Sequence, residues 1–265
     1  MISTLAHIHP AAQIGNNVKI DPFAVIEEGV IIGEGTHIMS HVVIMKNTIV
    51  GKSCTIFPGA VLGGIPQDLK FDGEETYVEI GDNTTIRECV TVNRGTKDKW
   101  KTKVGSNCLL MAYCHIAHDC ILADHVIIAN SVQLAGHVQI GDYAIIGGMA
   151  AAIQFSKIGA HSYIAGGTEV IKDVPPYIKA GRSPLSYVGV NSVGLQRRGF
   201  SQEKINSILE IYRNIYMRGL NISQATEIIE KELPDSEEKA EIIKFIRDSK
   251  RGILKISAKG ISDEN

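Results

Sequence analysis

A histidine followed directly by an aspartate stands in the middle of the chain, at His118 and Asp119. General base catalysis uses this arrangement, since the carboxylate orients the imidazole and stabilises its protonated form. Gly136 and His137 follow eighteen residues later, and Gln154 follows Gly136 by another eighteen. If residues eighteen apart are neighbours in space, these five form one surface with a base, an orienting carboxylate and an amide donor for developing negative charge. The alternative interpretation is an ordinary polar surface.

A repeat of six residues indicates the elements that would bring these residues together. In steps of six from Ile8 to Val170, 24 of 28 positions are Ile, Leu or Val. A second column, four residues after the first, is mostly small or β-branched. Neither the 3.6-residue period of a helix nor simple alternation produces this pattern. It is the hexapeptide signature of a parallel β-helix, in which three hexapeptides close one coil of about 18 residues and coils stack about 4.8 Å apart.

The predicted fold is therefore an all-β left-handed parallel β-helix over residues 1–172. A connector and a small α-helical C-terminal domain follow over residues 173–265. Pro175 and Pro176 are expected to end the sheet, because proline has no N–H to donate to a β-ladder.

Two interruptions of the aliphatic column predict loops at residues 63–78 and 93–103. The column fails there at Asp68, Glu74 and Asp98. Long excursions from a rigid scaffold often carry function, and a simple solvent-exposed flap is the alternative.

Capping residues followed by apolar stripes predict three helices in the C-terminal part. They run from Ser201 to near Gly219, from about Ser223 to Leu233 before a proline, and from Asp235 to near Gly252. The tail after Lys259 is expected to fray.

Composition narrows the classes of function. The formal net charge is −2, with 27 basic and 29 acidic residues, so no nucleic-acid partner is expected. The chain contains no run of 18 apolar residues and no signal-peptide pattern at its start, so neither a membrane span nor export is expected. We therefore expect a cytoplasmic protein, and no cofactor.

Cysteines and histidines are assigned by their place in the repeat. Four of the five cysteines occupy the small inward column, where they are expected to be buried filler rather than disulfide partners: Cys54, Cys108, Cys114 and Cys120. None of the nine histidines occupies an inward column, so all are expected to face outward. His115 and His118 have the spacing of a metal pair, but residues i and i+3 of a strand face opposite sides, so no metal is predicted.

Several longer motifs add specificity to the repeat. They are Cys114-His-Ile-Ala-His-Asp-Cys120, Leu134-Ala-Gly-His137, Ile145-Ile-Gly-Gly-Met149, Gln67-Asp-Leu-Lys70, Arg94-Gly-Thr96, Asp173-Val-Pro-Pro-Tyr177, Gly189-Val-Asn and Arg197-Arg-Gly-Phe200. Together they resemble the bacterial UDP-N-acetylglucosamine 3-O-acyltransferases, which catalyse the first step of lipid A biosynthesis. The resemblance covers the whole chain, the predicted helices included.

The resemblance implies roles for individual residues. The residue that matches His118 is the general base toward the glucosamine 3-hydroxyl, which attacks the thioester of a 3-hydroxyacyl carrier protein. The residue that matches Asp119 orients this base, and the amide of the residue that matches Gly136 faces the oxyanion. Matching residues that line the substrate site are Asp68, Lys70, His115, His137 and Gln154, and those toward the nucleotide or carrier end are Asn191, Arg197 and Arg198. The position that matches Gly166 limits acyl length, and the family is a homotrimer with sites between subunits.

The sequence departs from this family at three positions. Ile153 stands where the family often has His, Val193 where it often has an acidic residue, and Asn93 where His is common. These departures leave open the nucleotide contacts and whether the acceptor carries a 3-hydroxyl or a 3-amino group. Acyl length is also open.

Four other functions compete with this interpretation. An N-acyltransferase acting on UDP-3-acylglucosamine usually has an extra N-terminal domain, whereas here the hexapeptides begin at Ile8. A coenzyme A-dependent acetyltransferase would differ in its donor. A metal hydratase such as a γ-type carbonic anhydrase would need histidine ligands from two subunits, and a non-catalytic scaffold would leave the His118 surface unexplained.

Overall fold

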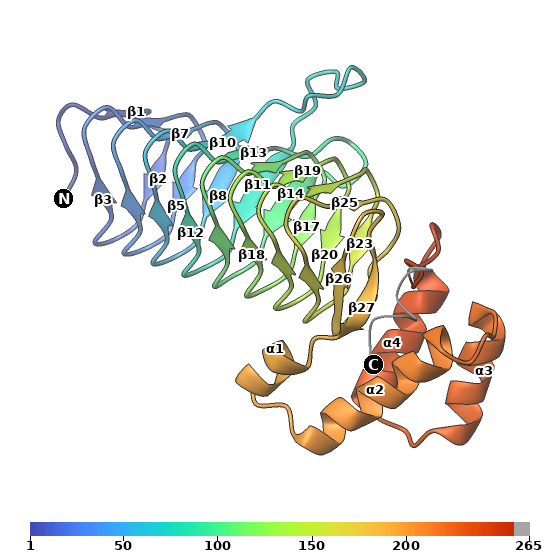
Figure 1. Ribbon diagram of the computed structural model, residues 1–265. Helices are drawn as coiled ribbons and strands as arrows, with labels where there is room; N and C mark the ends of the chain where they lie inside the picture. The colour runs from blue at the N-terminus through green and yellow to red at the C-terminus, as the bar shows by residue number, and fades with distance from the viewer. Residues whose placement is uncertain (257–265) are drawn as a thin grey trace.

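The computed structural model describes residues 1–256, and over them the chain winds as a parallel β-helix that ends in a group of helices (Figure 1). Three sheets form its walls, which we number one to three. Sheet one consists of β1 (His7–Ile8), β4 (Val25–Ile26), β7 (Val43–Ile44), β10 (Val61–Gly64), β13 (Thr91–Asn93), β16 (His115–Ile116), β19 (Gln133–Leu134), β22 (Ala151–Ala152) and β25 (Glu169–Val170). Sheet two consists of β2 (Gln13–Ile14), β5 (Ile31–Ile32), β8 (Thr48–Val50), β11 (Tyr77–Ile80), β14 (Lys101–Val104), β17 (Ile121–Leu122), β20 (Gln139–Ile140) and β23 (Lys157–Ile158).

Sheet three continues furthest toward the C-terminus. It consists of β3 (Lys19–Ile20), β6 (His37–Ile38), β9 (Thr55–Ile56), β12 (Thr85–Ile86), β15 (Leu109–Leu110), β18 (Ile127–Ile128), β21 (Ile145–Ile146), β24 (Tyr163–Ile164), β26 (Ile178–Gly181) and β27 (Ser186–Val190). The predicted fold class, a left-handed parallel β-helix followed by helices, is confirmed.

The six-residue period has a direct physical cause in this geometry. Strand partners of neighbouring uninterrupted coils are eighteen residues apart, as in Ile116 with Leu134 and Leu134 with Ala152. The aliphatic column is almost entirely buried, and the four cysteines of the small column are at most 2% exposed, which confirms their predicted burial. Burial of this continuous apolar ladder supplies the main stabilisation of the coils.

Left-handed residues form the corners between strands. Besides glycine and asparagine, bulky residues take this conformation, among them Asp119 (φ 60°) and His137 (φ 64°). Residues other than glycine rarely adopt this backbone conformation, so its recurrence every six residues is a consequence of the tight corner.

Both excursions leave the coil at the same corner, the one between sheets one and two. The first comprises residues 65–76 and the second residues 94–100, each flanked by strand. The first excursion projects away from the coils, in the teal segment beyond β10 (Figure 1). Leu69 in this excursion is fully exposed. We call this corner the first corner, and it contains His118, Gly136 and Gln154.

The sheet does not end at the two prolines, so that prediction is wrong. Val174 still pairs with Ile158, and β26 then pairs in parallel with β24 before β27 turns back antiparallel. Pro176 lies at a corner against Gly159, where a Cβ on the glycine would come within 2.3 Å of the proline nitrogen. The proline is tolerated because it stands between the paired residues rather than in the ladder.

Within residues 1–256, four helices follow: α1 (Ser192–Arg197), α2 (Gln202–Tyr216), α3 (Ile222–Glu232) and α4 (Glu237–Asp248). The last three agree with the predicted helices, and their caps Ser201, Asn221 and Ser236 each accept a backbone N–H. The short α1 was not predicted. Among the described residues, none of the helices has both the length and the apolar character needed to cross a bilayer. The predicted fraying after Lys259 lies outside the described residues.

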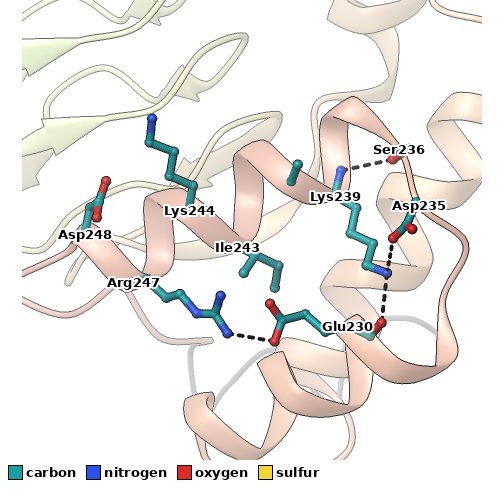
Figure 2. A pocket seen from close by; sticks show the side chains of 9 residues that line it. Glu230, Asp235, Ser236, Lys239, Ile243, Lys244, Arg247 and Asp248 are labelled. Atoms are coloured by element: carbon teal, nitrogen blue, oxygen red, sulfur yellow. Dashed lines mark hydrogen bonds and ion pairs between the residues drawn. The ribbon is translucent and has the colours of Figure 1, made fainter.

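A buried lysine joins α3 to α4 (Figure 2). The ammonium of Lys239, with a side chain 6% exposed, donates to the carbonyls of Glu230 and Leu233 and to the carboxylate of Asp235. Carbonyls at a helix C-terminus lack hydrogen-bond donors within the helix, and the Lys239 ammonium is the donor here. The polar hollow around it is therefore accounted for by helix capping.

Candidate active site

The first corner places the predicted base beside its carboxylate. His118 Nδ1 lies 2.8 Å from Asp119 Oδ2, and the two residues are 4% and 1% exposed. Since an ionised carboxylate can only accept, Nδ1 donates to it, and Nε2 keeps its lone pair. Within residues 1–256, Nε2 has no hydrogen-bond partner, and His118 lines a hollow of about 360 Å³. This is the tautomer that a general base requires.

The second excursion, residues 94–100, holds the carboxylate. Asp119 Oδ1 accepts from the amides of Thr96 (2.9 Å) and Lys99 (3.2 Å). Oδ2 accepts from the Thr96 hydroxyl at 2.7 Å, and the Asp119 amide donates to the hydroxyl of Thr102 at 2.8 Å. The excursion and Thr102 of β14 therefore orient the carboxylate, a role that the repeat alone did not indicate for Thr96 or Thr102.

Gly136 packs directly on the imidazole. A Cβ at this position would come within 2.5 Å of His118 Cε1 and 2.7 Å of Nε2, so only glycine leaves room for the ring. His137 stands edge-on to His118 at 5.1 Å and stacks on Phe155 at 4.4 Å. The stacking of residues eighteen apart thus brings Gly136 against His118, and Gln154 lines the same hollow.

The Gly136 amide is an available donor. At the same place in other repeats, the amides of Lys52, Ser106 and Asp124 each donate to a carboxylate oxygen from the next coil, at 2.7 to 2.8 Å. Within the described part of the chain, the Gly136 amide has no such acceptor. An anionic oxygen can therefore be bound at this position of the repeat, and the Gly136 amide is free to donate to one.

His115 lies on the same side as His118, which corrects one expectation. Both line the hollow, together with Gln67, Gln133 and Ile153. The strand comprises only two residues, so the chain has already turned at Ala117, and the alternation of a long strand does not apply. Thr91 Oγ1 lies 2.7 Å from Nδ1 of His115 and holds this ring in place. Burial, followed by the electrostatic effect of His118, lowers the pKa of His115.

Three of these side chains could in principle ligate a metal ion. His118, Asp119 and His137 bring ligand atoms within 4.8 Å of one another. The oxygens of Asp119 already accept four hydrogen bonds, and His137 Nδ1 lies 3.2 Å from Asp98 without hydrogen-bond geometry. A metal would have to displace these donors, so the donor set favours a His–Asp pair.

The remaining predicted residues do not join this hollow within one chain. Asp68 and Lys70 lie in the projecting excursion, where Asp68 accepts the Lys70 amide at 3.0 Å. Gly166 packs against the Gly148 carbonyl at the corner between sheets three and one.

The arginine motif packs at the corner between sheets two and three. Asn191 caps α1 and donates to the His161 carbonyl at 2.9 Å, and Arg198 donates to the Tyr143 carbonyl at 2.8 Å. Arg197 is the last residue of α1. The predicted residues are therefore divided among three corners of one chain.

Comparison with known proteins gives the family. A family model described as UDP N-acetylglucosamine O-acyltransferase, domain 2, matches residues 173–254, and a bacterial transferase hexapeptide model matches residues 11–46 and 101–136. An acyl-(acyl-carrier-protein)–UDP-N-acetylglucosamine O-acyltransferase of Thermodesulfovibrio yellowstonii is 44% identical over 96% of this chain and 99% of its own.

Solved structures agree with the sequence match. A UDP-N-acetylglucosamine acyltransferase of Bacteroides fragilis is 50% identical, with a TM-score of 0.95 over 96% of this chain and 100% of its own. The enzyme of Francisella novicida is 38% identical, with a TM-score of 0.94 over the whole of both chains. The chain belongs to the family of acyl-carrier-protein-dependent UDP-N-acetylglucosamine O-acyltransferases and is an acyltransferase of that family.

Proposed function

We propose that this protein transfers a 3-hydroxyacyl group from acyl carrier protein to the glucosamine 3-position of UDP-N-acetylglucosamine, the first step of lipid A biosynthesis, with His118 as general base. The observation that supports this most strongly is the geometry of the first corner. There His118 and Gly136 line one hollow, and neither Nε2 of the imidazole nor the glycine amide has a hydrogen-bond partner within residues 1–256, while the Asp119 carboxylate is bound to the other nitrogen of the ring.

The reaction follows from these groups. His118 Nε2 accepts the proton of the sugar hydroxyl as its oxygen attacks the thioester carbonyl, and Asp119 stabilises the imidazolium that forms. The Gly136 amide donates to the oxyanion of the tetrahedral intermediate. The intermediate then collapses with cleavage of the C–S bond. The proton passes from His118 to the leaving thiolate, which yields the sugar ester and the carrier thiol.

We further propose that the substrate site is completed by a second copy in a homotrimer. His115, His137 and Gln154 would bind substrate from the first corner of one subunit, and Asp68 and Lys70 from its projecting excursion. The neighbouring subunit would supply Asn191, Arg197, Arg198 and Gly166, since these lie at other corners of the same chain. The exposed Leu69 in the excursion fits a contact with such a neighbour. The cytoplasmic localisation stays a prediction.

Analysis of the reaction product tests this function. The purified protein is incubated with UDP-N-acetylglucosamine and a panel of acyl carrier protein thioesters, with coenzyme A thioesters as the matched donor control. Mass spectrometry is expected to find a 3-O-acylated sugar nucleotide formed from the carrier donor. Product only from coenzyme A thioesters, or acylation only of a 3-amino acceptor, would contradict the proposed substrates.

A metal-dependent hydratase is the second candidate, and the cluster of His118, Asp119 and His137 is the observation that favours it. We expect that chelators leave acyl transfer unchanged and that elemental analysis finds no stoichiometric zinc, because the Asp119 oxygens are already occupied by donors. Stoichiometric zinc that is lost in His137→Ala, together with the activity, would favour the hydratase.

A further inference from the structure

The first corner is held from coil to coil by a repeated backbone bond. The carbonyl of His118 accepts from the amide of His137 at 3.0 Å, and the carbonyl of Gly136 accepts from the amide of Phe155 at 3.1 Å. Each corner carbonyl is thus bound by the left-handed residue nineteen positions further on. Continuing this pattern, the carbonyl of Gln154 would accept from the amide of Asp173.

At Gln154 the pattern changes because the first corner ends there. The Asp173 amide donates instead to the carbonyl of Gly252 at 3.2 Å. The Gln154 carbonyl accepts from Nη2 of Arg251 at 2.6 Å, across 97 residues of sequence. A charged guanidinium therefore takes the place of the amide that a further coil would have supplied, and hydrogen bonds from charged donors are the stronger ones.

Other contacts place the segment that carries Arg251. Asp173, 1% exposed, accepts from the Ser249 hydroxyl at 2.7 Å, and its carbonyl accepts from the Leu254 amide at 3.0 Å. Lys172 Nζ donates to the Arg251 carbonyl at 2.6 Å. These bonds involve the backbone or other side chains, so the segment stays docked when the Arg251 side chain is changed.

We infer that Arg251 is a positioning residue of the active site: its guanidinium closes the first corner and holds Gln154 in the substrate hollow. The next residue, Phe155, carries the ring on which His137 stacks, and Arg251, Phe155 and His137 line one cavity of about 490 Å³ beside this bond. This inference rests on the proposed function, in which Gln154 and His137 bind substrate.

The test compares Arg251→Met, which keeps the length of the side chain without its donors, with Arg251→Lys and the control Ser249→Ala. Initial rates are measured over a range of UDP-N-acetylglucosamine concentrations at a fixed carrier thioester. Arg251→Met is expected to raise KM about tenfold, the effect of one lost charged hydrogen bond, with kcat lowered less than about twofold. Arg251→Lys keeps a charged donor, and its KM is expected to lie between those of the wild type and Arg251→Met. Ser249→Ala is expected to match the wild type, because the backbone bonds between Asp173 and the segment, and the bond from Lys172 to the Arg251 carbonyl, remain.

A double-mutant cycle separates positioning from general stability. If Arg251 acts through Gln154, then Arg251→Met adds nothing to the KM of Gln154→Ala, whereas it retains its full effect in Ser249→Ala. An unchanged KM in Arg251→Met and Arg251→Lys, or effects of Arg251 and Gln154 that multiply, would overturn the inference. Such a result with an active wild type leaves the proposed function standing, whereas a wild type that makes no acyl product refutes that function itself.

Discussion

The His118 imidazole fits into the first corner because Gly136 has no side chain. A Cβ there would meet Cε1 and Nε2 of His118 at 2.5 and 2.7 Å, in a site where the imidazole is 4% exposed and cannot move aside freely. The glycine therefore has two functions in the proposed mechanism: it leaves space for the ring and it offers its amide to the oxyanion.

Gly136→Ala is accordingly expected to lower kcat about 10²–10⁴-fold, the range for loss of a positioned general base, because the methyl group displaces the His118 ring. The melting temperature and the circular dichroism spectrum, measured on the same preparation, serve as the control for folding. A folded Gly136→Ala protein with wild-type kcat would show that the ring does not need its present position.

Among single residues, the sequence predicted those of the site that follow the six-residue repeat and missed those that lie outside it. His118, Gly136 and Gln154 could be placed together because stacked coils repeat at a fixed interval of eighteen residues. Thr96 lies in an excursion with no periodicity, so its bonds to Asp119 became visible only in the structure. Arg251 bonds to Gln154 across 97 residues, and no sequence pattern links such distant positions.

Elements of the coil are joined by stacked rings at the corner between sheets two and three. His161 lies between Tyr143 at 4.9 Å and Tyr177 at 5.5 Å, with Phe200 edge-on at 5.1 Å. Its Nδ1 is buried and has no hydrogen-bond partner in the part of the chain that the structure describes. Burial, followed by the charge of Arg198, lowers the pKa of His161 to about 4, against an opposing effect of Asp142.

This shift predicts a loss of stability in acid. A histidine with a lowered folded pKa is neutral in the native state, so its contribution is present above the unfolded pKa of about 6.5 and is lost as pH falls toward 4. Because the ring is partly exposed, we expect it to account for about 1–2 kcal/mol. Urea unfolding at pH 7 and pH 4.5 should show a smaller acid loss for His161→Phe than for the wild type. Equal losses in both would contradict this assignment.

Helices and strands could be predicted where the local sequence carries a strong cap or periodic pattern. The caps Ser201, Asn221 and Ser236 mark long amphipathic helices, and these helices were predicted to within a few residues. The six-residue α1 is too short for a hydrophobic period, so nothing in the sequence distinguished it from a loop. Pro176 was misleading because a proline rule for strands does not apply to a corner.

The whole molecule divides its predicted substrate residues among separate corners. His118 lies at the first corner, and Arg198 is bonded to Tyr143 at the corner between sheets two and three. The β-helix of one chain cannot bring two of its corners to the same ligand, so the proposed site needs a neighbouring subunit. Light scattering should then give three times the chain mass of 28.8 kDa.

Subunit mixing tests the shared site directly. His118→Ala and Arg198→Ala are each expected to be inactive as pure proteins. Co-expressed in equal amounts, they should recover about a quarter of wild-type activity, since that fraction of interfaces pairs an intact His118 with an intact Arg198. No recovery in a mixed trimer would mean that both residues act within one chain.

The proposed chemistry depends most directly on the His118 imidazole. The decisive measurement is the turnover of folded His118→Ala with UDP-N-acetylglucosamine and the preferred carrier thioester, followed by mass spectrometry of the 3-O-acyl product. Loss of a positioned general base is expected to lower kcat about 10²–10⁴-fold while the melting temperature stays close to that of the wild type. A folded His118→Ala protein that turns over at nearly the wild-type rate would contradict the mechanism.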